Sequence, residues 1–381
     1  MTDHSFIPPS GAHSWSKCAA WPKMNERFPQ PEGAEAVEGT AAHWVAWEIL
    51  RAAEITLKGV TPNGQTVTEE MLEGGELLCD IIKARITDQL FHELHIEEQI
   101  KIPLIAQSCF GTPDVWAVNF DHNHLEVIDY KFGHRFVDEF WNPQGLCYIT
   151  GILEHLCEHW KVAWGELINR MTISFTVVQP RCFYRGQPVR THTFKASDAV
   201  IRIMELQAKA TLALVHDPTA ATNEYCGDCP GRHACPALQL AAYTAAERSN
   251  SRIPVELDPA AAGLELRMLE RALRLLEARV EGLREVTISN IRAGKQVPYF
   301  RVEQGYGRLT WNLPENQIVA IGQMFGKDLS KPGVITPTQA KKIGVSEDVI
   351  KAYSFTPQTS LKLIPENPAD AARVFSQILH Q

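Results

Sequence analysis

The chain has 381 residues, of which 45% are apolar and 22% are charged, so fibrous and wholly disordered classes are excluded. Acidic residues outnumber basic ones by 45 to 37, which excludes a protein that coats nucleic acid by bulk positive charge. The nine cysteines are too sparse for a disulfide scaffold, no apolar run is long enough to cross a membrane, and no secretory-signal pattern is present. We therefore expect a cytoplasmic protein with reduced thiols and no membrane partner.

The first 214 residues alternate between helical and extended patterns. Apolar residues recur at helical spacing, whereas short runs rich in β-branched residues and bounded by turn residues predict strands. The first three strands are expected to be antiparallel neighbours, and the last two are expected to pair with each other. We predict helices over 34–49, 69–94, 143–160 and 196–214, and strands over 96–105, 113–120, 124–132, 171–180 and 188–195.

The remainder of the chain predicts a second domain. A Pro-containing linker is expected over 246–263, between a first domain at 1–245 and a C-terminal domain at 264–381 that mixes helices with a short β pattern. A predicted helix in the second domain carries apolar residues at heptad-like spacing, which could pack on the domain itself, on a partner or on another copy. These residues are Leu269, Leu273, Leu276, Val280 and Leu283.

Acidic residues and a lysine mark the predicted central strands. A Pro-Asp pair ends at Asp114, and Asp129 and Lys131 follow on the next predicted strand, where alternate residues share a face. Two carboxylates beside an ammonium group favour binding of Mg²⁺ or Mn²⁺ and charge stabilisation at a phosphate. The alternative is a surface salt bridge between Asp129 and Lys131. Upstream, His43 lies on the first predicted helix, and downstream Gln144 and Tyr148 lie one turn apart on another.

These motifs resemble the PD-(D/E)XK nucleases of the RecB type, a family that includes lambda exonuclease and the CRISPR-associated Cas-four nucleases. The matching segments are EGTAAH, GTPD, VIDYK and QGLCY, and the resemblance covers about residues 10–240. It implies a restriction-endonuclease-like α/β core with a central mixed sheet flanked by helices. It also implies a metal site at His43, Asp114 and Asp129, with Lys131, Gln144 and Tyr148 as further catalytic residues. Asp129 departs from the many members that carry glutamate.

A second cluster of candidate ligands is formed by cysteines. Cys226, Cys229 and Cys235 are closely spaced, and Cys18, in a predicted loop, is the best candidate for a fourth ligand. Thiolates at this spacing favour zinc or an iron–sulfur cluster. The resemblance implies a four-iron–four-sulfur cluster that ties the N-terminal loop to the later cysteines, with zinc as the alternative.

The resemblance further implies a DNA exonuclease, with cleavage in the 5′→3′ direction, in phage or prophage recombination, replication or repair inside a bacterial cell. Possible partners are a helicase, a single-strand-binding or annealing protein, or another copy of the chain. The alternatives are a non-catalytic module that binds DNA ends or a partner on the same fold, and a zinc-containing nuclease. Candidate phosphate contacts are Arg135, Arg181, Arg185 and Arg190.

Overall fold

The computed structural model describes residues 5–30, 33–51, 55–87, 89, 91–182, 187–248, 258–330, 336–355 and 362–365. Contacts between these residues define two compact units, Met1–Arg279 and Val280–Gln381. The predicted linker includes residues 249–257, which lie outside the described part, so the predicted division into domains stays a prediction. No helix among the described residues combines the length and apolarity that crossing a membrane requires.

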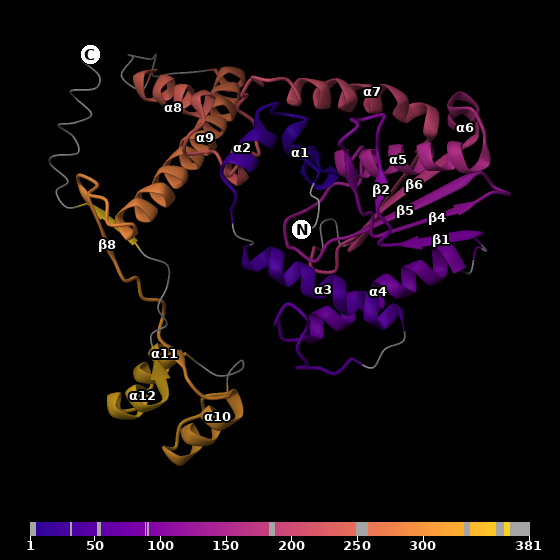
Figure 1. Ribbon diagram of the computed structural model, residues 1–381. Helices are drawn as coiled ribbons and strands as arrows, with labels where there is room; N and C mark the ends of the chain where they lie inside the picture. Colours follow the sequence, from indigo (N-terminus) through magenta and orange to yellow (C-terminus); the bar gives the residue numbers. More distant parts are fainter. Residues whose placement is uncertain are drawn as a thin grey trace. The chain divides into compact units, whose positions relative to one another are not determined.

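The first unit is built on a five-stranded mixed sheet with the order β1-β4-β5-β6-β7 (Figure 1). Strands β5 and β6 are parallel, and the other neighbours are antiparallel. The parallel pair requires a crossover, which α5 and α6 provide. A separate antiparallel pair joins β2 to β3. The strands are β1 Glu93–Ile96, β2 Ile100–Lys101, β3 Phe110–Gly111, β4 Val115–Asn119, β5 His124–Tyr130, β6 Thr172–Val178 and β7 Val189–Lys195.

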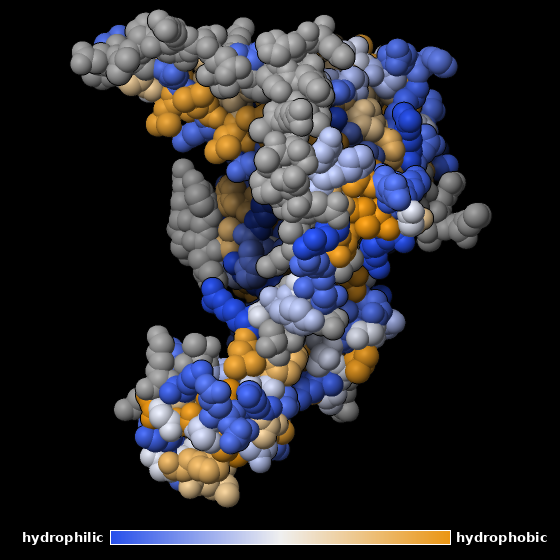
Figure 2. Space-filling view, turned by 90° about the vertical axis from the view of Figure 1, so that its left-hand side faces the viewer, coloured by the Kyte–Doolittle hydropathy of each residue, from blue (hydrophilic) through white to orange (hydrophobic). Residues whose placement is uncertain are grey.

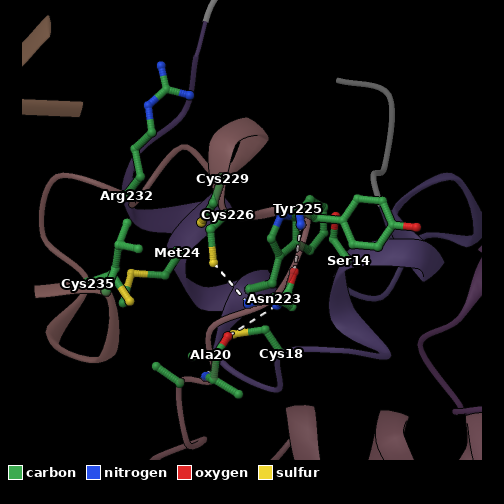
Figure 3. A pocket seen from close by; sticks show the side chains of 14 residues that line it. Ser14, Cys18, Ala20, Met24, Asn223, Tyr225, Cys226, Cys229, Arg232 and Cys235 are labelled. Atoms are coloured by element: carbon green, nitrogen blue, oxygen red, sulfur yellow. Dashed lines mark hydrogen bonds between the residues drawn. The ribbon is translucent and has the colours of Figure 1, made fainter. Parts of the chain in front are cut away.

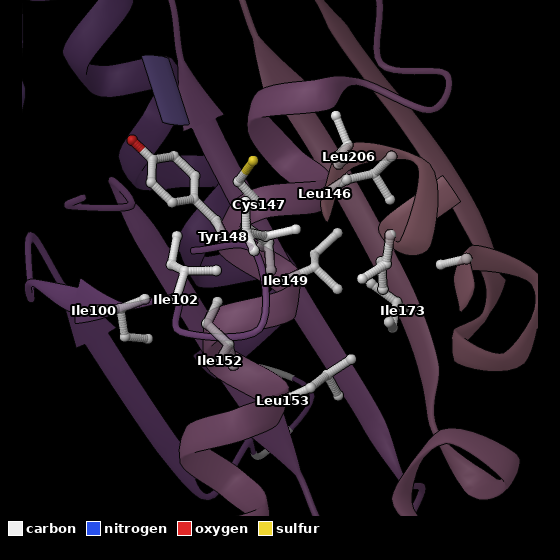
Figure 4. Close-up of a cluster of buried hydrophobic side chains, with 14 of the residues drawn as sticks. Ile100, Ile102, Leu146, Cys147, Tyr148, Ile149, Ile152, Leu153, Ile173 and Leu206 are labelled. Atoms are coloured by element: carbon white, nitrogen blue, oxygen red, sulfur yellow. The ribbon is translucent and has the colours of Figure 1, made fainter. Parts of the chain in front are cut away.

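Helices cover both faces of this sheet. The α5 side is the larger core, in which apolar residues of α5 and α7 pack on β4, β5 and β6 (Figure 4). On the other face, α3 and α4 pack against Val115, Ile128 and Tyr130. The helices of this unit are α1 Ala12–Trp15, α2 Trp21–Arg27, α3 Ala34–Leu50, α4 Glu69–Ile82, α5 Pro143–Trp160, α6 Trp164–Arg170, α7 Ala196–Ala213 and α8 Pro236–Arg248, together with most of α9, Pro259–Arg292.

Two sequence predictions are wrong in the region between α4 and β4. The helix predicted to reach Leu94 ends at Ile82 and continues only as a π-helical turn over Lys83–Thr87. The strand predicted over 96–105 is instead divided between β1 and β2. The division occurs at Glu97, whose φ of +49° interrupts the extended run, so that only β1 pairs with β4. A non-glycine residue with positive φ has no clear sequence signature.

The second unit has its own small core, centred on Ile318, Leu329 and Ala340. Its two antiparallel strand pairs, β8 with β11 and β9 with β10, agree with the short β pattern expected there. The elements are β8 Phe300–Glu303, β9 Thr310–Trp311, α10 Glu315–Met324, α11 Pro337–Lys342, α12 Glu347–Tyr353, β10 Ser354–Phe355 and β11 Lys362–Pro365.

Helix α5 lies close to the sheet at Gly145, where a Cβ atom would lie 2.6 Å from the ring of Phe175. We expect Gly145→Ala to destabilise the protein by about 1–3 kcal/mol, because the ring and the helix must move apart. Gly165→Ala is the matched control, since a Cβ atom there meets nothing within 4 Å, and it should be neutral or slightly stabilising. Urea denaturation measures both, and equal stability of the two variants would contradict the close packing.

Candidate active site

One end of the central sheet brings together the two aspartates that the sequence indicated. In the antiparallel register of β4 and β5, Val115 lies opposite Ile128. One position further, the register places Asp114, directly before β4, beside Asp129 on β5, so the two carboxyl groups share a face. The Asp114 Oδ2 atom accepts a hydrogen bond of 2.7 Å from the backbone N–H of Tyr130, which fixes this carboxyl group at the strand ends.

Burial makes the negatively charged form of both carboxyl groups unfavourable and so raises their pKa values. It raises the pKa of Asp114 to about 6. Burial also raises the pKa of Asp129, against the lowering effect of Lys131, and the charge of Asp114 raises it further. The Asp129 Oδ2 atom is buried without a hydrogen-bond partner. An unpaired buried carboxylate oxygen is unfavourable unless a ligand binds it, and a hard divalent cation suits this donor set.

Lys131 supplies positive charge on the same face. Its Nζ atom donates to Asp129 Oδ1 at 3.1 Å. Burial lowers the pKa of Lys131, but the Asp129 and Asp114 carboxylates outweigh burial and raise it. The side chain is therefore protonated at neutral pH and can donate hydrogen bonds rather than accept a proton. The ion pair considered as an alternative does form, but it is not a surface pair, since the Asp129 side chain is only 4% exposed.

His43 approaches the carboxyl groups from α3. Its Nδ1 atom lies 3.5 Å from Asp114 Oδ1, and its ring packs edge-on against the ring of Tyr130. Burial, and then the charge of Lys131, lower the pKa of His43 to about 4. The imidazole is therefore neutral at physiological pH, which is the form that binds metals.

Glu97 is a third carboxylate at this place, and sequence reasoning missed it. Its charge acts to raise the pKa of both Asp114 and His43. The Glu97 backbone N–H donates to the Asp114 carbonyl oxygen at 3.0 Å, and the indole N–H of Trp47 donates to the Glu97 carboxylate. Little in the sequence indicated this residue, because Glu97 begins three polar residues within a segment whose apolar and β-branched residues predict one continuous strand.

Gln144 and Tyr148 lie one turn apart on α5, facing Asp129. Gln144 Nε2 donates to Asp129 Oδ1 at 3.2 Å and lies 3.4 Å from the Tyr148 hydroxyl oxygen. The first turn of the helix is fixed by Asn142, whose side chain accepts hydrogen bonds from the backbone N–H groups of Gln144 and Gly145. The glutamine amide thereby orients the same carboxyl group that Lys131 contacts.

The raised pKa of Asp114 predicts that the folded protein loses stability as pH rises, and that a bound metal ion would offset this loss. Because the folded-state pKa of about 6 exceeds the unfolded value of 3.8, the contribution of this group to stability is fully present below about pH 4 and is lost as pH rises through 6. In a chelator at pH 8, Asp114→Asn should therefore be more stable than the wild type, by up to about 3 kcal/mol. The two proteins should differ little near pH 4.

Urea denaturation of both proteins in chelator across this pH range measures the effect. His43 has the opposite effect, because its lowered pKa makes the folded state more stable as pH rises. Both proteins carry His43, so comparing them removes its contribution. A difference in unfolding free energy that does not grow with pH would contradict the assignment of the raised pKa to Asp114.

The four predicted cysteine ligands line one pocket of the first unit (Figure 3). Backbone N–H groups point at two of the sulfur atoms, from Ala221 to Cys18 at 3.5 Å and from Asn223 to Cys226 at 3.3 Å. Such hydrogen bonds stabilise sulfur that carries negative charge. Burial raises the pKa of Cys229 to about 11, so this thiol is neutral unless a bound cation holds it as a thiolate. The pocket cysteines are Cys18, Cys226, Cys229 and Cys235.

The pocket as it stands has a volume of about 20 Å³. This is room for one or two water-sized groups, so either metal centre would require the cysteine side chains to move. In the described part of the chain, no three His, Cys, Asp or Glu side chains are grouped closely enough to hold a metal ion without such adjustment. Metals at both the carboxylate and the cysteine sites therefore stay predictions.

Of the four predicted phosphate-binding arginines, Arg135 lies in an exposed loop. Arg135 follows β5, is 68% exposed and forms an ion pair with Asp228, between the pocket residues Cys226 and Cys229. This pair links the cysteine pocket to the loop that begins at Lys131. Arg185 lies outside the described residues.

The other two arginines are bound within the fold. Arg181 forms ion pairs with Glu38 on α3 at 2.7 Å and Glu70 on α4 at 2.6 Å. Arg190 is buried, and it donates to Gln179 Oε1 at 2.8 Å and pairs with Glu139 at 3.3 Å. A guanidinium group already bonded in the interior is poorly placed for a phosphate, so Arg190 is not expected to contact DNA.

The fold defines a mixed α/β protein whose central sheet is flanked by helices and carries a buried carboxylate–lysine–histidine cluster at one end. The family described as "Protein of unknown function (DUF2800)" matches residues 4–370, and the chain belongs to this family. Among solved structures, the chain is similar to one from Eubacterium rectale named "Putative exonuclease", with 9% sequence identity and a TM-score of 0.33. The similarity covers 67% of this chain and 91% of that one, and it carries no argument about activity.

Proposed function

We propose that this protein is a metal-dependent DNA exonuclease that hydrolyses phosphodiester bonds at the carboxylate cluster. The observation that carries the proposal is the convergence of Asp114, Asp129 and Lys131 on one face of the sheet, with a buried Asp129 oxygen left unpaired. Structural ion pairs seldom leave a buried carboxylate oxygen without a partner. The match of this cluster to the RecB-type motifs supports the same reaction.

A Mg²⁺ or Mn²⁺ ion held by Asp114, Asp129 and His43 would supply positive charge against the scissile phosphate. Protonated Lys131 would donate a hydrogen bond to the attacking water or to a phosphate oxygen, which stabilises the charge that develops there. Gln144 would keep the Asp129 carboxyl group in position through its hydrogen bond. Water attack on phosphorus with loss of the 3′ oxygen leaves a 5′-phosphate and a 3′-hydroxyl.

The DNA end would approach along the loop between Lys131 and α5. Exposed side chains of this loop include Arg135 for phosphate contacts and Phe140, which is 58% exposed, for stacking on an unpaired base. The neighbouring Trp141 is already covered by Arg202 at 4.5 Å from its ring centroid and by His192. Trp141 therefore supports the loop, and Phe140 is the better candidate for contact with a base.

We also propose that the cysteine pocket holds a metal centre with a structural role. Either a four-iron–four-sulfur cluster or a zinc ion would crosslink Cys18 to a segment about 200 residues later. The donor set supports both, through its four sulfur atoms and the N–H groups directed at two of them. Iron, sulfide and zinc analysis of anaerobically purified protein distinguishes the two.

The proposed activity is tested by incubating end-labelled linear duplex, linear single-stranded DNA and closed circular DNA with the protein and Mn²⁺ or Mg²⁺. We expect mononucleotides from the linear substrates, first from the 5′ ends, with no cleavage of the circle and none in chelator. Cleavage of the circle would indicate an endonuclease. Binding of linear DNA without any cleavage would instead support the non-catalytic module.

A further inference from the structure

An apolar stripe runs along α9 on the side that the neighbouring segments leave open. Its side chains recur at alternating spacings of three and four residues, the heptad pattern of helices that pack against another helix. Five of the six are between 42% and 59% exposed, and in Figure 2 exposed apolar side chains gather in separate patches on a largely hydrophilic surface. The stripe residues are Leu266, Leu269, Leu273, Leu276, Val280 and Leu283.

One side of α9 already packs on other residues of the first unit. The stripe lies on a different side of the helix. Ala278 is 5% exposed, and the Arg279 guanidinium group donates to the backbone carbonyl oxygens of Arg232 and His233. Leu269 lies at the rim of an apolar groove of about 900 Å³ that α8 helps to form. The helix is thus held on one side, while the stripe lacks a cover among the described residues.

Charged residues beside the stripe determine which kind of helix can cover it. In the heptad frame, Glu265 and Arg279 flank one side of the stripe, where Arg279 is already bonded to the first unit. Glu270, Glu277 and Arg284 flank the other side. A parallel copy of α9 would bring Glu265 against Glu270 across the interface, which is repulsive. An antiparallel copy would bring Glu270 against Arg284 at both ends, which is attractive, and Glu277 against Glu277 of the second copy at the centre, which is repulsive. The two attractive contacts outnumber the one repulsive contact.

We propose that the stripe is a dimerisation surface on which α9 of a second copy of this chain packs antiparallel. In that arrangement Leu273 meets Leu276 at the centre, Leu269 meets Val280, and Leu266 meets Leu283, so every apolar layer is filled by the same surface of both copies. A two-fold symmetric pair requires this self-complementarity. Arg284 also forms an ion pair with Glu281 on its own helix, and the contact across the interface adds to that pair.

The mass of the full-length protein in solution, measured by sedimentation equilibrium, tests the proposal. The wild type should reach twice the chain mass of 42.7 kDa, and Leu273→Glu should remain at the single-chain mass. Because Leu273 is 55% exposed, its replacement should leave the far-ultraviolet circular dichroism unchanged. Leu264→Glu is the matched control, on the same helix and 66% exposed but off the stripe, and should dimerise like the wild type.

Charge exchange tests the orientation. Glu270→Arg should weaken dimerisation by about tenfold, and adding Arg284→Glu should restore it, because the pair is re-formed with opposite signs. The proposal is overturned if the wild type stays at the single-chain mass at the highest attainable concentration, or if Leu273→Glu still dimerises. Tighter dimerisation of Glu270→Arg alone would indicate a parallel pair and would overturn the antiparallel assignment.

Discussion

Replacing Asp129 by asparagine should lower the rate of DNA hydrolysis by on the order of a thousandfold, because the variant loses a charged ligand of the proposed cation at the reacting phosphate. The new amide would keep an oxygen that can accept from Lys131 and Gln144, so the fold should persist. DNA affinity should be unchanged or higher, because the variant removes negative charge near the phosphate. A quantitative assay of nucleotide release, with parallel measurement of DNA binding, separates the two effects.

The matched control is Glu126→Gln on the same strand. Glu126 is also a buried carboxyl group, but it faces the opposite side of the sheet, where it contacts Arg85 and Thr176. Loss of activity in both variants would point to a general effect of neutralising a buried carboxylate. Loss in Asp129→Asn alone supports the site, and full activity of Asp129→Asn would contradict it. Lys131→Ala should show a loss comparable to that of Asp129→Asn.

Replacing Cys229 by serine should prevent binding of the proposed metal centre in the cysteine pocket and lower the melting temperature by about 10–20 °C. The physical reason is entropic: a crosslink from Cys18 to the later cysteines closes a loop of about 200 residues, worth about 5 kcal/mol by loop-closure entropy. Metal analysis and thermal denaturation of anaerobically purified protein measure the two effects together.

Cys79→Ser serves as the control for this prediction, because Cys79 is a half-buried cysteine on α4 that does not line the pocket. It should retain both the metal and the melting temperature. A Cys229→Ser protein with unchanged metal content and unchanged melting temperature would contradict a crosslink at this place. Colourless wild-type protein that contains zinc would show that the crosslink is formed by a zinc ion and not by an iron–sulfur cluster.

The cysteine pocket and the carboxylate cluster are connected through the loop after β5. The Arg135–Asp228 ion pair joins this loop to the turn between Cys226 and Cys229. Because the loop begins at Lys131 and leads to Gln144, loss of the crosslink should also disturb the site to which both residues belong. We therefore expect the rate of DNA hydrolysis to fall in Cys229→Ser even below its melting temperature.

The elements that carry the site could be predicted from the sequence because their signals are local. Asn142 and Pro143 mark the start of α5, and the observed helix has the predicted bounds, Pro143–Trp160. The alternating and β-branched runs gave β4, β5, β6 and β7 and the antiparallel pairing of β4 with β5. With that pairing, the approach of Asp114 to Asp129 follows from the register alone.

The features that sequence reasoning missed depend on tertiary contacts. The positive φ of Glu97 divides a run that is rich enough in apolar and β-branched residues to predict one strand. Arg190 has the sequence context of a solvated hairpin residue, yet it is buried through bonds to Gln179 and Glu139 that no local pattern announces. Burial and long-range pairing of this kind are set by the packing of distant segments.

The most direct test of the proposed site is the binding of Mn²⁺, measured by electron paramagnetic resonance of the free ion. We predict that the wild type binds Mn²⁺ with a stoichiometry that falls by at least one ion per chain when Asp114 and Asp129 are both replaced by asparagine. The Glu126→Gln variant should bind as the wild type does. Equal Mn²⁺ binding by the wild type and the double variant would show that these carboxylates do not form a cation site.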